Sequence, residues 1–123
     1  MVNVDDVINW VKTLADKINK EATAKERIKK WIKKSYWGKI ISWKMNSKGF
    51  FIVITRDGTV KFGTGDYPSP EVTMIISPDS FMELLKKDPY SGLKECLATN
   101  QLVIQGNLNE ANQFLDAAKD ILK

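Results

Sequence analysis

Few side chains in this sequence could carry out chemistry. Its 123 residues include one cysteine, Cys96, and no histidine. The usual metal ligand and the usual acid–base group at neutral pH are both missing, so one chain cannot form a catalytic triad or a histidine metal site. Cys96 has Lys94 nearby but no histidine to lower the pKa of its thiol. We therefore expect a half-buried structural cysteine rather than a nucleophile.

Two further patterns are weak signals for catalysis. Gly63-Thr64-Gly65 contains a fragment of a phosphate-binding loop, but it follows a predicted hairpin and does not open a helix. The acidic pair Asp5 and Asp6 is placed to favour the positive end of a helix dipole. The sequence predicts no enzyme, no metal and no cofactor. An enzyme that uses Cys96 on esters or thioesters is the least favoured alternative.

Composition favours one folded domain that spans residues 1–123. Apolar residues are 43% and charged residues 28%, which is typical of globular proteins and not of disordered ones. A single cysteine excludes a disulfide within one chain and favours a reducing compartment. The first residues carry acids and no apolar run of the signal-peptide type, and no stretch approaches the length of a membrane span. We expect a soluble, cytoplasmic protein.

Charge is distributed unevenly along the chain. Residues 1–62 hold 14 Lys and Arg against 6 Asp and Glu, whereas residues 63–123 hold 5 against 9. This asymmetry favours a surface that attracts anions such as phospholipid headgroups, nucleic acid or an acidic partner. A solvated basic face is the alternative.

Lysine and tryptophan occur together in the most basic segment, a combination that suits a membrane interface. The residues predicted to contact a membrane surface or anionic headgroups are Lys29, Lys30, Trp31, Lys33, Lys34 and Trp37. No nucleic-acid partner is expected, because the sequence lacks a reading-helix pattern, a ribonucleoprotein motif and a zinc site.

Hydrophobic periodicity predicts the helices. They cover residues 4–18, a segment from Thr23 to Gly38, a segment that begins at Pro78, and residues 108–122. Thr23 and Glu26 have the capping-box spacing, and Ser77-Pro78 is a typical helix start. Asp88-Pro89 ends the third helix, and a short amphipathic turn anchored by Leu93 and Leu97 follows.

Alternating apolar residues predict five strands, over residues 39–45, 50–54, 59–62, 72–76 and 101–105. Asp57-Gly58 is a strong hairpin signal between the second and third strands. Residues 50–54 are all apolar, which predicts a strand covered on both faces. The order of elements indicates an α+β fold in which helices from both ends of the chain cover one face of a sheet.

Two segments resemble the sterol carrier protein family, the type-two sterol and lipid-transfer domain. Residues 70–81 (PEVTMIISPDSF) are similar to its strand-then-helix signature, and residues 102–107 (LVIQGN) resemble its last strand. With the hairpin around Asp57 in the matching order, the resemblance extends from about Val4 to Leu122. It implies a five-stranded, mostly antiparallel sheet with helices packed on one face. The chain does not end in a peroxisomal tripeptide of the Ser-Lys-Leu kind.

The resemblance also implies an apolar cavity between sheet and helices that binds or transfers a fatty acid, fatty acyl-CoA, phospholipid, or sterol or isoprenoid lipid. The residues predicted to line it are Trp43, Phe51, Val53, Phe62, Met74, Phe81, Met82, Leu85, Phe114 and Leu115. Aromatic and thioether side chains suit flexible lipids, although ordinary core packing explains each residue singly. The alternative is a module for protein interaction or dimerisation with the same fold and a filled core; a homodimer is left open.

Overall fold

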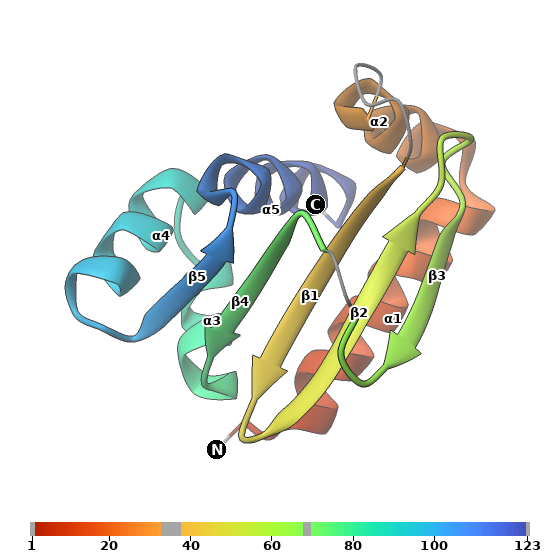
Figure 1. Ribbon diagram of the computed structural model, residues 1–123. Coiled ribbons are helices and arrows are strands. Elements are labelled where there is room, and N and C mark those ends of the chain that lie inside the picture. The colour runs from red at the N-terminus through yellow and green to blue at the C-terminus, as the bar shows by residue number, and fades with distance from the viewer. Residues whose placement is uncertain (1, 33–37, 68–69, 123) are drawn as a thin grey trace.

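A computed structural model of the chain describes residues 2–32, 38–67 and 70–122. The helices and strands follow the predicted order (Figure 1). Their bounds are α1 (Val4–Lys20), α2 (Ala22–Ile32), β1 (Lys39–Met45), β2 (Lys48–Ile54), β3 (Val60–Thr64), β4 (Val72–Ile76), α3 (Pro78–Leu85), α4 (Pro89–Ala98), β5 (Leu102–Gly106) and α5 (Leu108–Ile121).

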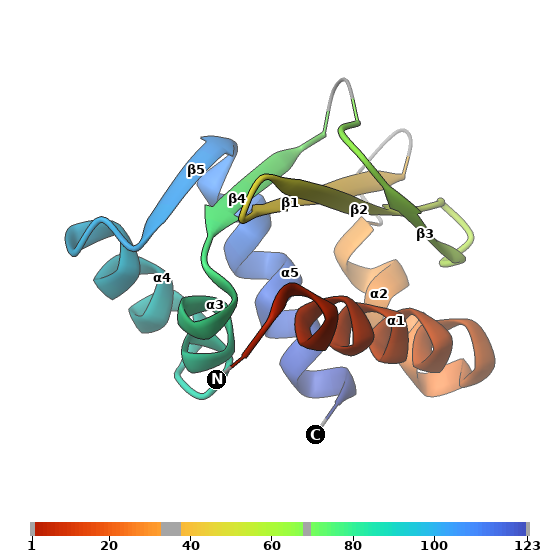
Figure 2. The ribbon, with the colours of Figure 1, turned by 90° about the horizontal axis from the view of Figure 1, so that it is seen from below.

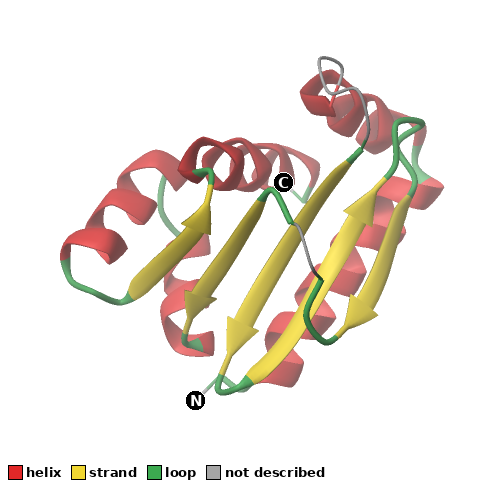
Figure 3. Ribbon diagram, viewed as in Figure 1, coloured by secondary structure: helices red, strands yellow, loops and turns green. Residues whose placement is uncertain are grey.

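The strands form one sheet in the order β3-β2-β1-β4-β5, which places β1 in the middle (Figure 3). β1 pairs with β4 in parallel, and the β1–β2, β2–β3 and β4–β5 pairs are antiparallel. The prediction of a five-stranded, mostly antiparallel sheet is confirmed. The parallel pair joins the two halves of the chain, because β4 follows the hairpins and returns beside β1.

All five described helices lie on one face of the sheet, as Figure 2 shows in profile. α1 runs beneath β2 and β3, α5 beneath β1 and β4, and α3 and α4 lie toward the β5 edge. An antiparallel sheet with one solvated face needs cover on the other, and helices from both ends of the chain supply it. This arrangement confirms the predicted layering.

Burial alternates along β2 because only one face of the sheet is covered. Phe50, Ile52 and Ile54 are buried against the helices, whereas Phe51 and Val53 are half-buried on the opposite face. Successive side chains of a strand point to opposite faces, so an all-apolar strand does not require two covered faces. The prediction that residues 50–54 are covered on both faces is wrong.

The predicted helix starts are mostly confirmed. Asn3 caps α1 in a reciprocal arrangement with Asp6, in which each side chain accepts a hydrogen bond from the other residue's backbone N–H at 3.0 Å. Ser77 caps α3. Asp88 caps α4, a ten-residue helix that is longer than the short helical turn expected there. β5 begins one residue later than expected, at Leu102.

The predicted start of the second helix at Thr23 is wrong. Glu21 alone separates α1 from α2 and has an extended backbone, with φ −110° and ψ 125°. Its N–H donates to the Lys17 carbonyl at 2.9 Å, and its own carbonyl accepts from the Lys25 N–H at 3.0 Å. One residue therefore ends one helix and begins the next, which leaves Thr23 inside α2.

Both hairpins use left-handed backbone conformations. Asn46 and Ser47 have φ of 50° and 67°, the two-residue turn whose twist matches antiparallel strands. In the second hairpin Gly58 has φ 85°. Asp57 accepts hydrogen bonds from the Thr55 hydroxyl and from the Thr59 N–H, and these contacts lower its pKa to about 2.

The backbone of Gly58 also lies close to side chains of α2, and this contact can be tested with a matched pair of variants. A Cβ on Gly58 would lie 2.8 Å from Lys25 Cγ, whereas a Cβ on Gly65, with φ 96°, would meet nothing within 4 Å. Gly65→Ala should cost only the left-handed strain, about 1–2 kcal/mol. Gly58→Ala should lower the free energy of unfolding further, because it also displaces the Lys25 stem. Urea denaturation of both variants measures the difference, and equal losses would contradict the close contact.

Candidate functional site

A cluster of aromatic rings fills the centre of the space between sheet and helices. Trp43, on the central strand, stacks on Phe50 of β2 with ring centroids 5.3 Å apart. It meets Phe81 of α3 at 6.2 Å and Phe114 of α5 at 5.6 Å, both edge-on. Trp10 of α1 extends the cluster through Phe81 at 5.6 Å. The rings thus connect the sheet to three helices.

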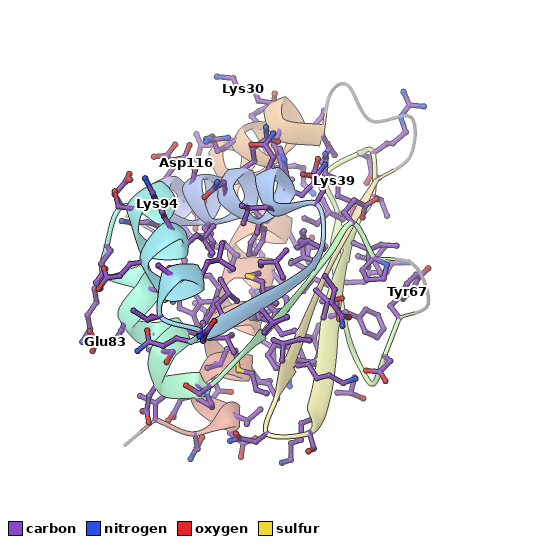
Figure 4. All side chains as sticks on the ribbon, turned by 60° about the vertical axis from the view of Figure 1, so that its left-hand side comes forward. Lys30, Lys39, Tyr67, Glu83, Lys94 and Asp116 are labelled. Carbon is purple, nitrogen blue, oxygen red and sulfur yellow. The ribbon has the colours of Figure 1, made fainter. Side chains whose placement is uncertain are left out.

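The structure brings eight of the ten predicted lining residues to this side of the sheet. We call the space between the sheet's helix face and the helices the apolar layer; the eight that border it are Trp43, Phe62, Met74, Phe81, Met82, Leu85, Phe114 and Leu115. Phe51 and Val53 lie on the opposite face, where the Phe51 ring contacts Tyr67 at 5.1 Å. Figure 4 shows Tyr67 on that far side of the sheet. These two residues cannot share a space with Trp43.

The centre of the apolar layer is densely packed. Trp43, Phe81, Phe114 and Met74 are 0% exposed, and Leu115 is 1% exposed. Met82, Leu85 and Phe62 are only partly buried and pack at its margins. Two hollows bordered by described residues open at the surface beside α2, and none of the ten predicted residues lines either of them.

The larger hollow, of about 480 Å³, lies between α2 and the β2–β3 hairpin. Glu26, Lys29, Lys30, Ile32 and Arg56 line it. Three cations and one carboxylate make this hollow attractive to anions. Arg56 is not among the residues predicted from the sequence, because its place beside the Asp57-Gly58 turn does not reveal that this turn docks against α2.

Other basic residues of α2 have partners within the fold. Lys25 donates to the Gly58 carbonyl at 3.1 Å. Arg27 reaches α5, with nitrogen–oxygen distances of 3.3 Å to Asp116 and 2.9 Å to Asp120. Lys30 points away from the molecule at the outer end of α2 (Figure 4). Lys25 and Arg27, which are not among the predicted contact residues, are therefore engaged within the molecule.

Trp31, predicted to contact a membrane, packs between helices. Its indole N–H donates to Gln113 Oε1 at 2.8 Å, and its ring lies 5.9 Å from the Phe114 ring. The Lys39 ammonium lies 5.1 Å from the Trp31 ring centroid. Lys33, Lys34 and Trp37 fall outside the described residues.

Lys39 and Glu110 form a buried ion pair that the sequence analysis did not predict. The two groups are 2.6 Å apart, with side chains 10% and 16% exposed. Lys39 begins the central strand on its helix face, and Glu110 lies in the first turn of α5. The pair fixes the start of α5 over the sheet next to the aromatic cluster. No short-range pattern links two residues that are 71 positions apart.

Cys96 is poorly suited to catalysis. It is 4% exposed, and burial raises the pKa of its thiol, with Glu95 adding to this effect against an opposing contribution from Lys87. In the part of the chain that the structure describes, no group of three Cys, Asp or Glu side chains is placed to hold a metal ion. None of the described helices is long and apolar enough to cross a bilayer.

Comparison with known families identifies the fold. The model of the family described as "SCP-2 sterol transfer family" matches residues 11–119, which cover all the described strands and most of the helices. The chain belongs to the SCP-2 sterol transfer family. The resemblance inferred from residues 70–81 and 102–107 is thereby confirmed. No curated protein matches the sequence.

Solved structures agree with this assignment. The UbiJ-SCP2 ubiquinone synthesis protein has a TM-score of 0.67 at 16% identity, over 90% of this chain and 86% of its own. Apo sterol carrier protein 2 from Yarrowia lipolytica has a TM-score of 0.61 at 18% identity, over 89% and 87%. Sterol carrier protein domain 2 of Helicoverpa armigera has a TM-score of 0.58 at 21% identity, over 94% and 87%. At these identities the likeness shows the SCP-2 fold alone.

The buried ion pair of this family member can be tested by removing one partner. Glu110→Leu should lower the free energy of unfolding by about 3–5 kcal/mol, because the Lys39 ammonium would stay buried without its counter-charge. The double variant Lys39→Met/Glu110→Leu should recover most of that loss. Glu83→Leu, which breaks the exposed Lys86–Glu83 pair, is the control and should change little. A double variant as unstable as Glu110→Leu would show that the charge is not the cause.

Proposed function

We propose that this protein binds one lipid molecule in the apolar layer and carries it between membranes or acceptor proteins without catalysing a reaction on it. Membership of the SCP-2 sterol transfer family is the observation that carries this proposal. The fold supports it, because helices from three parts of the chain face the sheet across a centre made of buried apolar and aromatic side chains. The expected ligands are a fatty acid, a fatty acyl-CoA, a phospholipid, or a sterol or isoprenoid lipid.

Burial of an alkyl chain provides the driving force. Each methylene removed from water contributes about 0.8 kcal/mol, so about eight of them contribute about 6 kcal/mol. Packed rings fill the layer, so a ligand must displace them, and the loss of their contacts offsets part of this gain. We propose that the helices move away from the sheet when the lipid enters. Met74 and Met82 suit this repacking because thioether side chains are flexible.

The α3 margin is the proposed point of entry. Met82 and Leu85 are only partly buried there, although they pack against the core. A lipid tail that reaches them meets apolar surface already in contact with water. From that point the path leads past Phe81 to Trp43, whose rings are in contact.

The burial of Cys96 supports binding without catalysis. A thiol whose pKa is raised by burial is mostly protonated at neutral pH, and a protonated thiol is a poor nucleophile. We propose that Cys96 serves the packing of α4 and has no part in turnover of the lipid.

A matched pair of variants tests lipid binding in the apolar layer. Met82→Lys places a charge at the margin of the layer, and Val53→Lys places the same charge on a half-buried site of the other sheet face. Delipidated protein should bind cis-parinaric acid, seen by fluorescence, and native mass spectrometry should detect a co-purified lipid. Met82→Lys should weaken binding at least tenfold, and Val53→Lys should leave it unchanged. Protein that ignores cis-parinaric acid, palmitoyl-CoA and phospholipid would overturn the proposal.

We also propose that the hollow beside α2 meets anionic headgroups when the carrier collects or delivers its lipid. Lys29, Lys30 and Arg56 are exposed, and all three border the hollow. Each cation near an anionic bilayer contributes about 1 kcal/mol, and salt screens the attraction. Lys29 is weakly held by Glu26, at 3.7 Å, and stays available for this contact.

Vesicle binding tests the headgroup contact. Lys29→Glu/Lys30→Glu should reduce co-sedimentation with phosphatidylglycerol vesicles at least tenfold, and 0.5 M salt should have a similar effect on the unaltered protein. Lys48→Glu/Lys94→Glu makes the same change of charge at exposed sites away from the hollow and should bind nearly normally. Equal losses in both double variants would mean that net charge alone attracts the protein.

A further inference from the structure

Trp43 carries a hydrogen-bond donor that no group in the described part of the chain accepts. Its side chain is 0% exposed, and its indole Nε1 has no hydrogen-bond partner within the described residues. Buried tryptophan N–H groups usually find a partner, because a donor removed from water without one destabilises the fold. An unpaired donor therefore lies at the centre of the apolar layer.

The surroundings explain why no protein oxygen takes this position. The Trp43 ring stacks on Phe50 and meets the rings of Phe81 and Phe114 edge-on, and these three rings offer no oxygen to its N–H. β1 is paired on both sides, with β2 and β4, and its backbone carbonyls are engaged in those ladders. Aromatic faces are at best weak acceptors.

Two other polar side chains, those of Trp31 and Asn112, differ from that of Trp43. The Trp31 indole N–H, also near Phe114, donates to Gln113 Oε1 at 2.8 Å. Asn112 Oδ1 is the second buried side-chain atom without a partner in the described part of the chain. Asn112 lies two helical turns before Lys119, which donates to the Lys87 carbonyl between α3 and α4, so Asn112 and Lys119 share one side of α5.

We propose that the lipid bound in the apolar layer presents a neutral oxygen atom, a hydroxyl or a carbonyl, to Trp43 Nε1. This inference rests on the proposed lipid-binding function and specifies the ligand further. A neutral oxygen fits because an ionised group would lose its hydration at the centre of an apolar layer. A ligand that offers only carbon at this point leaves the N–H unpaired, so Trp43 selects oxygen-bearing lipids over hydrocarbons.

Trp43→Phe tests this selection, because it removes the N–H and keeps an aromatic ring. The probes are diphenylhexatriene, a fluorescent hydrocarbon, and hexadecan-1-ol, which displaces it. Trp43→Phe should weaken hexadecan-1-ol about fivefold to tenfold and leave diphenylhexatriene within about twofold. Tyr67→Phe, which removes a polar hydrogen from a ring on the other face of the sheet, is the control and should alter neither affinity.

A second measurement uses the unaltered protein, in case Trp43→Phe does not fold. In a ¹H–¹⁵N spectrum, nuclear Overhauser contacts with the rings of Phe50 and Phe114 identify the Trp43 indole signal. This signal should move downfield with hexadecan-1-ol, as a new hydrogen bond requires, and less with diphenylhexatriene.

The outcomes separate the two proposals. If hexadecan-1-ol binds but neither the Trp43→Phe affinity nor the indole signal responds, the role of Trp43 is refuted and lipid binding stands. If both affinities fall equally in Trp43→Phe, the ring contributes only packing, which also refutes it. If no probe binds, and cis-parinaric acid does not bind either, both proposals fail.

Discussion

Trp43 lies on the middle strand of the sheet, where its ring stacks on Phe50 and contacts Phe81 and Phe114 edge-on. These contacts hold helices from the later half of the chain against a sheet that begins in the earlier half. Aromatic pairs of this geometry stabilise a core beyond the area they bury. Because the sheet is covered on one face only, the fold depends on this single apolar layer.

The packing that stabilises the fold also occupies the space proposed for the lipid. A carrier built in this way must give up ring contacts as its ligand enters, and the ligand must supply equivalent apolar contacts in return. The partly buried residues at the α3 margin, Met82 and Leu85, offer a place for this exchange to begin. The unpaired N–H of Trp43 would then favour ligands that carry a neutral oxygen over hydrocarbons.

Charged residues are divided unevenly between the two halves of the chain. The earlier half is basic and the later half is acidic, and the fold places basic α2 beside acidic α5. Arg27 meets Asp116 and Asp120 there, and Lys39 meets Glu110 nearby. Part of the uneven charge is therefore used within the molecule. Lys29, Lys30 and Arg56 are left around the hollow, where they can attract an anionic surface.

The sequence by itself determined the local structure and the fold class. Periodicity and turn signals such as Ser77-Pro78 and Asp57-Gly58 predicted the order of elements, because they reflect interactions between residues close in the chain. The error at Thr23 arose where two local signals competed: its capping pattern was sound, but Glu21 already provided the helix start.

Only the tertiary structure decided which apolar residues face one another. Phe51 and Val53 are as apolar as Phe50 and Ile52, so residue type alone does not separate the two pairs. Because successive side chains of a strand alternate between faces and the helices cover only one face, Phe51 and Val53 lie on the other face. The ion pair of Lys39 with Glu110 and the unpaired N–H of Trp43 likewise depend on contacts between residues far apart in sequence. Such contacts produce no repeating pattern in the sequence, because the packing of the layers, and not the spacing of residues, determines which partners meet.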